Sequence, residues 1–362
     1  MLNFAVGPVM MGQSTLNIGS EQIPYFRTEN FSAVMKQNER LFKSFLNAPE
    51  NARAVFMTGS GTASMEAAVI NTLNKNDRAL IVNGGSFGAR FCEICSVYEI
   101  PYTQINCDFG KTLTDAQLLP FENGGYTAFI VNLCETSTGV LYDLRLISDF
   151  CKRNGLLLIV DAVSAFLCDS LDMTKHKIDV VITGSQKALA LAPGLSLMCF
   201  SQRAVDRILA NEQKSFYFDL KKYLKDGERG QTPFTPAVGI ILQLNNRFKE
   251  IAAKGGAAAE IAAARHKAEY FRAAIKDLPL DIFSDNPSNA VTSLTLNDKN
   301  KSAYKLFELL MNEYGIWLCP NGGNLKDKVF RVGHMGALND ADYDLLVDAL
   351  TKGLRSEKIN ND

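Results

Sequence analysis

The 362-residue sequence lacks several features that would fix its class at once. No block of one charge occurs, since 38 Lys and Arg balance 39 Asp and Glu to a net charge of −1. The basic face of a nucleic-acid-binding protein is therefore not expected. The longest apolar runs are broken by Asp161 or by Pro193 and Gly194, so none reaches a membrane-spanning length. The composition, 47% hydrophobic and 21% charged, is typical of a soluble globular protein of about two domains.

The sequence also lacks a clear metal-binding motif, a regular disulfide pattern and an export signal. Eight cysteines without regular spacing predict buried thiols in a reducing compartment. Cys92 and Cys95 have the C-x-x-C spacing, but no second pair follows and only three histidines are present, so we expect two helix-face thiols and no bound metal. The first residues have no basic region before a long apolar stretch. They are interpreted as a structured arm, and the cytoplasm is the expected location.

Short apolar runs alternate with helical stretches through the first two thirds of the chain, the pattern of a mostly parallel sheet covered by helices on both faces. The predicted strands are 52–58, 78–83, 127–133, 156–162, 179–184 and 195–201. The predicted helices include 62–74, 88–99 and 143–154. After about residue 235 an alanine-rich stretch predicts two helices separated at Gly255 and Gly256, and the remainder predicts a smaller α+β unit. We expect an arm (1–15), a large domain (16–240) and a small C-terminal domain (241–362).

A lysine lies at the end of one of these apolar strands. Gln186 and Lys187 follow the strand 179–184, and a loop with Pro193 and Gly194 comes next. Desolvation at such a position lowers the pKa of a lysine and makes its amine a nucleophile toward an aldehyde. Lys187 is therefore a candidate for a covalent bond to an aldehyde cofactor. An ordinary surface lysine explains this stretch alone equally well.

Two further segments carry candidate chemistry. Asp161 ends an apolar strand, and ligands of open α/β sheets bind outside the carboxyl ends of the strands. A protonated pyridine nitrogen would satisfy this buried carboxylate and become an electron sink, although a helix N-cap is the alternative role. The turn 59–62, GSGT, offers N–H groups and hydroxyls at a helix start, which suits a phosphate or a plainly capped helix. It is neither a P-loop nor G-x-G-x-x-G, which disfavours a nicotinamide-dependent dehydrogenase.

In chain order, this turn, Asp161 and Lys187 resemble the class V, fold-type I enzymes that use pyridoxal 5'-phosphate (PLP). The resemblance covers nearly the whole chain and is greatest to the alanine–glyoxylate, serine–glyoxylate and 2-aminoethylphosphonate–pyruvate aminotransferases. It implies an α/β fold, with a large domain around a mostly parallel sheet and a smaller C-terminal α+β domain. It also implies a PLP cofactor, a small-molecule amino donor with an oxo-acid acceptor, and a homodimer with active sites at its interface.

The resemblance also assigns roles to residues of this chain. Lys187 would form the Schiff base with PLP, Asp161 would pair with the pyridinium nitrogen, and Phe87 in VNGGSFGAR would stack on the ring. Thr136 in CETSTG would lie near the ring oxygen. The predicted phosphate ligands are Ser60, Gly61, Thr62, Gln186 and, from the neighbouring subunit, Thr232.

The predicted substrate site consists of Gly7, beside Pro8 in the arm, and Arg331 in KVFRVGHMG. An arginine there would hold a substrate carboxylate through a planar bidentate pair, a role that lysine does not copy. The arm departs from its relatives, because Phe26 stands where they often have a histidine, and the segment GERGQTPF puts phosphonate binding in doubt.

The expected reaction is a ping-pong transfer of an amino group from a small amino acid or aminophosphonate to pyruvate or glyoxylate. Lys187 would serve as both cofactor anchor and general acid/base. The alternative within the same fold is a PLP-dependent lyase or cysteine desulfurase. A desulfurase needs a mobile loop cysteine, whereas Cys319 lies in a segment that favours a strand. A non-catalytic relative is disfavoured, because packing requires none of Lys187, Asp161 and Arg331.

Overall fold

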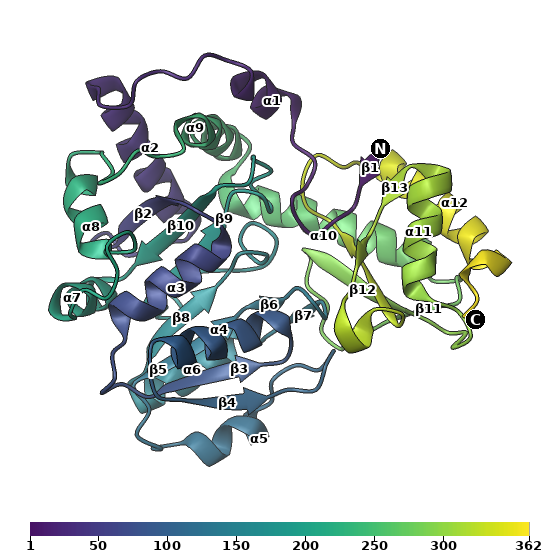
Figure 1. The fold of residues 1–362 in the computed structure, drawn as a ribbon, viewed down its shortest axis with the longest axis horizontal. Coiled ribbons are helices and arrows are strands. Elements are labelled where there is room, and N and C mark those ends of the chain that lie inside the picture. Colours follow the sequence, from purple (N-terminus) through teal and green to yellow (C-terminus); the bar gives the residue numbers. More distant parts are fainter. Residues whose placement is uncertain (362) are drawn as a thin grey trace.

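The computed structural model describes residues 1–361, which form a larger part around a seven-stranded sheet and a smaller part around a four-stranded sheet (Figure 1). The strands of the large sheet are, in spatial order, β2 (Arg53–Thr58), β10 (Leu195–Phe200), β9 (Val180–Gly184), β8 (Leu157–Asp161), β5 (Ala128–Asn132), β3 (Ala79–Asn83) and β4 (Tyr102–Asn106). From β9 to β4 all neighbours are parallel, whereas β10 is antiparallel to both of its neighbours. The predicted mostly parallel sheet is confirmed, and β4 is a strand that the sequence reading did not name.

Both faces of this sheet are buried, which explains why its strands are apolar without alternation. Leu158 and Val160 of β8 point into one core, and Leu157 and Ile159 point into the other. The first core is covered by α2 (Glu29–Phe45), α6 (Leu144–Asn154) and α9 (Val238–Ala253). The second is covered by α3 (Gly61–Thr72), α4 (Ser86–Val97), α7 (Gln202–Ala210) and α8 (Leu220–Glu228). Outside these layers lie α1 (Gln13–Gly19), α5 (Asp115–Leu118), the 3-10 turn Leu119–Phe121, and the hairpin of β6 (Cys134–Glu135) and β7 (Val140–Leu141).

The smaller part has its own sheet and hydrophobic core. Its strands, in spatial order, are β11 (Leu280–Ile282), β12 (Val291–Leu296), β15 (Val329–Gly333) and β14 (Cys319–Pro320). Its helices are α10 (Gly256–Ala274), α11 (Ala303–Tyr314) and α12 (Asp340–Leu354), with 3-10 turns at Gly323–Leu325 and Glu357–Ile359. Gly255 adopts a left-handed conformation, φ +105°, between α9 and α10, so the predicted break between two helices is confirmed.

The N-terminal arm runs along both parts. Its strand β1 (Leu2–Asn3) pairs with β13 (Ile316–Trp317) of the smaller part (Figure 1). The expected domain boundary at residue 240 falls within α9, which packs on α1 and α2. The division into 1–15, 16–240 and 241–362 stays a prediction.

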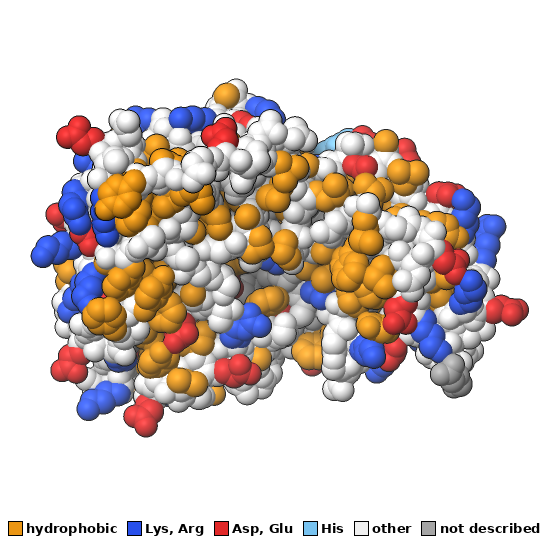
Figure 2. Space-filling model, turned by 45° about the horizontal axis from the view of Figure 1, so that its top comes forward, with side chains coloured by type: hydrophobic (Ala, Val, Ile, Leu, Met, Phe, Trp, Pro, Cys, Tyr) orange, Lys and Arg blue, Asp and Glu red, His pale blue; other side chains and the backbone are white. Residues whose placement is uncertain are grey.

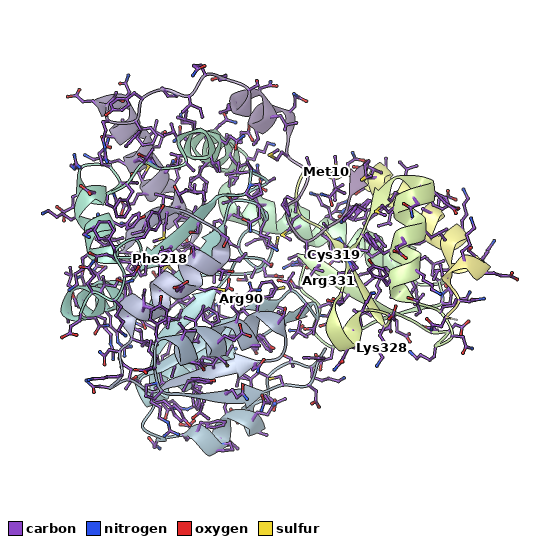
Figure 3. The ribbon with its side chains drawn as sticks, viewed as in Figure 1. Met10, Arg90, Phe218, Cys319, Lys328 and Arg331 are labelled. Carbon is purple, nitrogen blue, oxygen red and sulfur yellow. The ribbon has the colours of Figure 1, made fainter. Side chains whose placement is uncertain are left out.

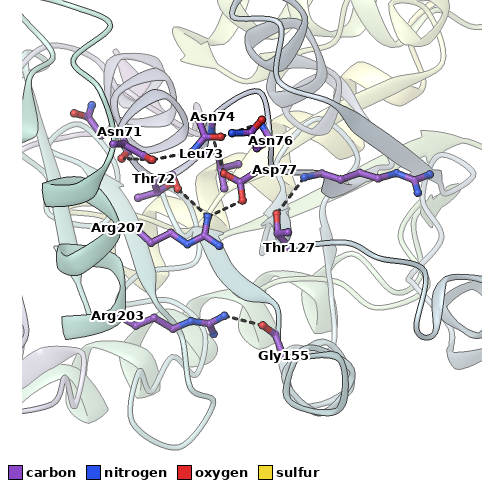
Figure 4. Close-up of polar contacts among 12 residues, drawn as sticks. Asn71, Thr72, Leu73, Asn74, Asn76, Asp77, Thr127, Gly155, Arg203 and Arg207 are labelled. Atoms are coloured by element: carbon purple, nitrogen blue, oxygen red, sulfur yellow. Dashed lines mark hydrogen bonds and ion pairs between the residues drawn. The ribbon is translucent and has the colours of Figure 1, made fainter.

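The end of the large sheet at which the parallel strands begin is held together by arginines. The side chain of Asp77, before β3, is 6% exposed and accepts a hydrogen bond from Arg207 Nη1 of α7 at 2.6 Å (Figure 4). Arg207 also donates to the Thr72 carbonyl, and Arg203 Nη2 donates to the Gly155 carbonyl at 2.7 Å. These contacts fasten α7 to the neighbouring loops, so this end of the sheet is structural.

The two cysteines with C-x-x-C spacing, Cys92 and Cys95, lie on α4 and face the second core of the large sheet. Burial raises the pKa of Cys92 to about 11 and that of Cys95 to about 12, so both are thiols at neutral pH. Within residues 1–361, no group of three His, Cys, Asp or Glu side chains is arranged to hold a metal ion. Over the same residues, no helix combines the length and the apolar character needed to cross a membrane.

Candidate active site

Lys187 is a buried amine just beyond the carboxyl end of β9. Its side chain is 8% exposed, and Nζ donates a hydrogen bond to the Val6 carbonyl of the arm at 2.5 Å. Burial lowers the pKa of Lys187, and the positive charge of Arg331 acts in the same direction. The amine is therefore easier to deprotonate than a surface lysine, as a nucleophile requires.

The arm shapes the space around this amine. Gly7 has φ +126°, and a Cβ at that position would lie 2.7 Å from Cδ of Lys187. No side chain fits there, and the conformation itself favours glycine. Gly7, predicted to lie at the substrate site, thus contacts the side chain of Lys187.

Asp161 ends β8, the strand beside β9, so the two side chains belong to the same edge of the sheet. It is 5% exposed, and its Oδ1 accepts a hydrogen bond from the Val163 N–H at 2.8 Å. Burial raises the pKa of Asp161 to about 6, although the Val163 N–H and the charge of Lys187 act to lower it. A buried carboxylate with so little compensation is costly, which suits a group that a cationic ligand completes.

The predicted phosphate turn lies at the start of α3. Ser60 is the N-cap residue, but its side chain makes no capping hydrogen bond, so the first N–H groups of the helix remain available to an anion. The hydroxyl of Thr62 accepts a hydrogen bond from Arg90 Nη1 at 3.1 Å. Among the described residues, the buried Oε1 atom of Gln186 has no hydrogen-bond partner.

The aromatic residue expected over the cofactor, Phe87, lies in the first turn of the neighbouring helix α4. The N–H groups of Phe87 and Gly88 donate to Oε2 of Glu135 at 3.2 and 3.1 Å, and Glu135 itself is completely buried. The guanidinium carbon of Arg90 is 4.8 Å from the centre of the Phe87 ring. Glu135 therefore fixes the backbone at Phe87, and Arg90 covers one face of the Phe87 ring.

Arg331 links β15 to the turn that carries Thr136. Its Nη1 donates to the Thr136 carbonyl at 3.1 Å and its Nη2 to the Pro320 carbonyl at 2.6 Å, while the buried Nε has no partner among the described residues. The Thr136 hydroxyl is 2.8 Å from that of Ser164. The contacts of this guanidinium are thus neutral carbonyls, which leaves its charge for a ligand.

A cleft of about 640 Å³ runs between the two parts of the molecule and includes Phe87 and Arg331 in its walls. Arg331 is the one charged residue among the described residues that line it, and amides such as Asn83, Asn321 and Asn324 supply much of its polarity. Figure 3 labels Arg331 and Cys319 in the smaller part and Arg90 in the larger part. The cleft therefore suits a small ligand with a single anionic group.

The structure brings most of the predicted residues to one place at the carboxyl end of the sheet. Thr232 makes its contacts elsewhere, since its hydroxyl donates to the Phe234 carbonyl at 2.7 Å and its own carbonyl accepts from Arg27. Its expected role in a neighbouring subunit stays a prediction. Sequence reasoning missed Arg90 and Glu135, although both lie inside quoted motifs. No spacing in the sequence marked either residue, because the predicted helix 88–99 began after Phe87 and the contacts of both residues join separate elements.

The polar groups of this site that have few or no partners match the chemical groups of PLP. A buried amine of lowered pKa suits an aldehyde, and a buried carboxylate with one hydrogen-bond donor suits a protonated ring nitrogen. An uncapped helix start offers N–H donors to a phosphate, and Gln186 would add its side-chain amide nitrogen as a further donor. Lys187, Asp161 and the turn at Ser60 would hold those three groups.

Comparison with known proteins points the same way. A family model described as aminotransferase class V matches residues 19–323. A protein of Synechococcus named as the small subunit of a soluble hydrogenase is 31% identical over 95% of this chain and 90% of its own length. An L-aspartate–glyoxylate aminotransferase of Paracoccus denitrificans is 28% identical, over 80% of this chain and 75% of its own. The crystal structure of an aspartate aminotransferase from Thermus thermophilus superposes with a TM-score of 0.90 at 25% identity, covering 99% of this chain and all of that one.

Proposed function

The chain belongs to the class V aminotransferase family, and from that membership we propose that it moves an amino group from a small amino acid or aminophosphonate to glyoxylate or pyruvate. It is a transaminase of the PLP-transferase type I fold with PLP as cofactor, and these predictions from the sequence are confirmed. The roles of individual residues and the identity of the substrates are the proposal.

The observation that carries the proposal is the buried amine of Lys187 at the same sheet edge as the buried carboxylate of Asp161. When bound, PLP supplies an aldehyde for an amine and a ring that withdraws electrons from the substrate carbon. Lys187 would hold the cofactor through its aldehyde, and its amine, when free, would move a proton as general acid/base. Asp161 would keep the ring nitrogen protonated, and the N–H groups at the start of α3 would bind the phosphate.

Arg331 orients the substrate in this proposal. Its guanidinium touches only backbone carbonyls among the described residues, so a carboxylate would be its first anionic partner. The remaining cleft wall is uncharged, which favours a small donor with a neutral side chain. The two oxo acids of the proposal, glyoxylate and pyruvate, carry one carboxylate each and meet the same requirement. Donor and acceptor therefore use the same site in turn, as a ping-pong reaction requires.

We further propose a cytoplasmic homodimer. Several large apolar side chains are exposed on α1, in the segment after it and in the segment before α8, namely Leu16, Ile23, Tyr25, Phe216 and Tyr217. Figure 2 shows hydrophobic side chains gathered on the face turned toward the viewer, with a hollow near its middle. Exposed apolar surface of this kind suits a subunit interface. Thr232 would then meet the phosphate of the neighbouring active site.

The test is a half-reaction screen on the purified, PLP-loaded protein. Single amino compounds are added without any oxo acid, and the absorbance of the cofactor is followed as it converts to its amino form. L-Serine, L-alanine and 2-aminoethylphosphonate are tried first, with L-aspartate as the doubly anionic comparison. We expect conversion by a small neutral donor. Absence of conversion by any donor, together with sulfide release from cysteine, would favour the desulfurase alternative.

A further inference from the structure

Arg90 is a charged residue beside the cofactor site that the proposed reaction has not yet used. It lies one helical turn after Phe87 on α4, with its guanidinium carbon 4.8 Å from the centre of that ring. Its Nη1 donates to the Thr62 hydroxyl of α3 at 3.1 Å. Arg90 therefore touches the aromatic residue and the phosphate turn at once, and these belong to two different helices.

Glu135 fixes the backbone of Phe87, whereas Arg90 contacts its ring. Besides the N–H groups of Phe87 and Gly88, this buried carboxylate accepts hydrogen bonds from Asn132 Nδ2 at 2.8 Å and from the Ser137 hydroxyl at 2.5 Å. The start of α4 is thus anchored. What remains free in Phe87 is the rotation of its side chain, and Arg90 restricts that rotation on one face of the ring.

We propose that Arg90 is a positioning residue that presses the Phe87 ring against the cofactor and ties it to the phosphate turn. The inference rests on the proposed function, in which Phe87 stacks on PLP and Thr62 contacts the phosphate. A guanidinium that covers one face of an aromatic ring leaves the opposite face for a second flat partner. Its planar fork keeps a hydrogen bond to Thr62 in the same geometry, which the single ammonium of lysine does not reproduce.

The chain offers a matched control outside the site. Arg78 lies over the ring of Tyr126 at 4.4 Å and donates to the Gly124 carbonyl and the Thr103 hydroxyl. The contact is of the same type, a guanidinium on an aromatic ring with hydrogen bonds to neighbouring groups. It lies before β3, at the other end of the sheet. Arg78→Met therefore removes a similar interaction without touching the cofactor site.

The experiment measures PLP binding to cofactor-free protein by titration, together with the circular dichroism of the bound cofactor. We expect Arg90→Met to raise the dissociation constant of PLP about tenfold and to weaken the dichroic band, because the ring is no longer fixed. Arg90→Lys should recover only part of this loss. Arg78→Met should bind PLP like the wild type. The melting temperature of each cofactor-free variant is recorded, and a fall in Arg90→Met without any change in PLP affinity would show a purely structural role and overturn the inference.

A double-mutant cycle with Phe87→Leu separates positioning from direct contact with the phosphate. If Arg90 acts through the ring, Arg90→Met should cost less than about threefold in PLP affinity once Phe87 is gone. An equal tenfold loss in both backgrounds would overturn the inference, since the arginine would then act independently of the ring. A wild-type protein that binds no PLP would instead refute the proposed function itself, a result distinguishable from either outcome of the cycle.

Discussion

Two buried aspartates stand at opposite ends of the large sheet, and their surroundings differ. Asp77 accepts hydrogen bonds from Arg207 Nη1 at 2.6 Å and from the Asn74 N–H at 2.9 Å. Burial raises its pKa, but these hydrogen bonds, led by that of Arg207, outweigh burial, and the pKa of Asp77 is lowered overall. Asp161 has the Val163 N–H and the more distant charges of Lys187 and Arg90, and burial raises its pKa to about 6.

The difference separates structural polar groups from functional ones. At the end where the parallel strands begin, each arginine in Figure 4 already has its partners within the protein. At the carboxyl end, the Lys187 amine and the Asp161 carboxylate are buried with few partners, and the buried Gln186 Oε1 and Arg331 Nε have none among the described residues. Such concentrations of unsatisfied groups persist where a ligand completes them.

The largest effect should come from Lys187→Ala. We expect loss of the visible absorbance of the lysine-bound cofactor and a fall in transamination of at least about 10²–10⁴-fold, because the general acid/base is removed. Lys214→Ala is the control, since the pKa of Lys214 is also lowered by burial but its amine donates to the Leu73 carbonyl, away from the site. Retention of the wild-type spectrum in Lys187→Ala would contradict the assignment.

Asp161→Asn should impair catalysis by about a hundredfold or more, since the ring nitrogen loses its charged partner. The cofactor-free variant should nevertheless be more stable than the wild type. Because the folded-state pKa of Asp161 is raised from 3.8 to about 6, its contribution to stability is fully present below pH 3.8 and is lost as the pH rises through about 6. Urea unfolding at acid and neutral pH measures this, and the advantage of Asn should appear only above that range. An equal difference at every pH would contradict the interpretation.

Arg331→Lys should act on the substrate and spare the cofactor. We expect the KM for the amino donor to rise about tenfold or more with unchanged PLP affinity, because the bidentate pair with the carboxylate is lost. Steady-state kinetics with a separate PLP titration distinguish the two. A lower PLP affinity with an unchanged KM would show that Arg331 belongs to the cofactor site instead.

The smallest effect on activity should come from Asp77→Asn, where the comparison predicts a loss of stability only. Breaking the pair with Arg207, whose side chain is 30% exposed, should cost about 1–3 kcal/mol in the free energy of unfolding. Since the pKa of Asp77 is lowered, this contribution is present above its unfolded value of 3.8 and disappears as the pH falls below it. The rate per PLP-loaded active site should match the wild type. A catalytic defect would remove the contrast between the two aspartates.

Much of this arrangement could be predicted from the sequence, for identifiable reasons. The strands that end at Asp161 and before Lys187 are buried on both faces, so their apolar runs predicted both strands. The parallel pattern also predicted that their carboxyl ends lie together. The antiparallel direction of β10 was not predicted, because a buried strand has the same composition in either direction. Arg90 and Glu135 were not predicted as site residues. Arg90 connects α4 to Thr62 of α3, and Glu135 accepts from the N–H groups at the start of α4, and spacing along the chain does not encode such contacts between elements. The packing of α9 on the larger part was hidden for the same reason.

The most direct test of the account is to find the lysine that bears the cofactor. The PLP-loaded protein is reduced with borohydride, digested, and its peptides are examined by mass spectrometry. We expect one modified lysine, Lys187, in the wild type and none in Lys187→Ala. A cofactor mass on another lysine, or none on any, would contradict it.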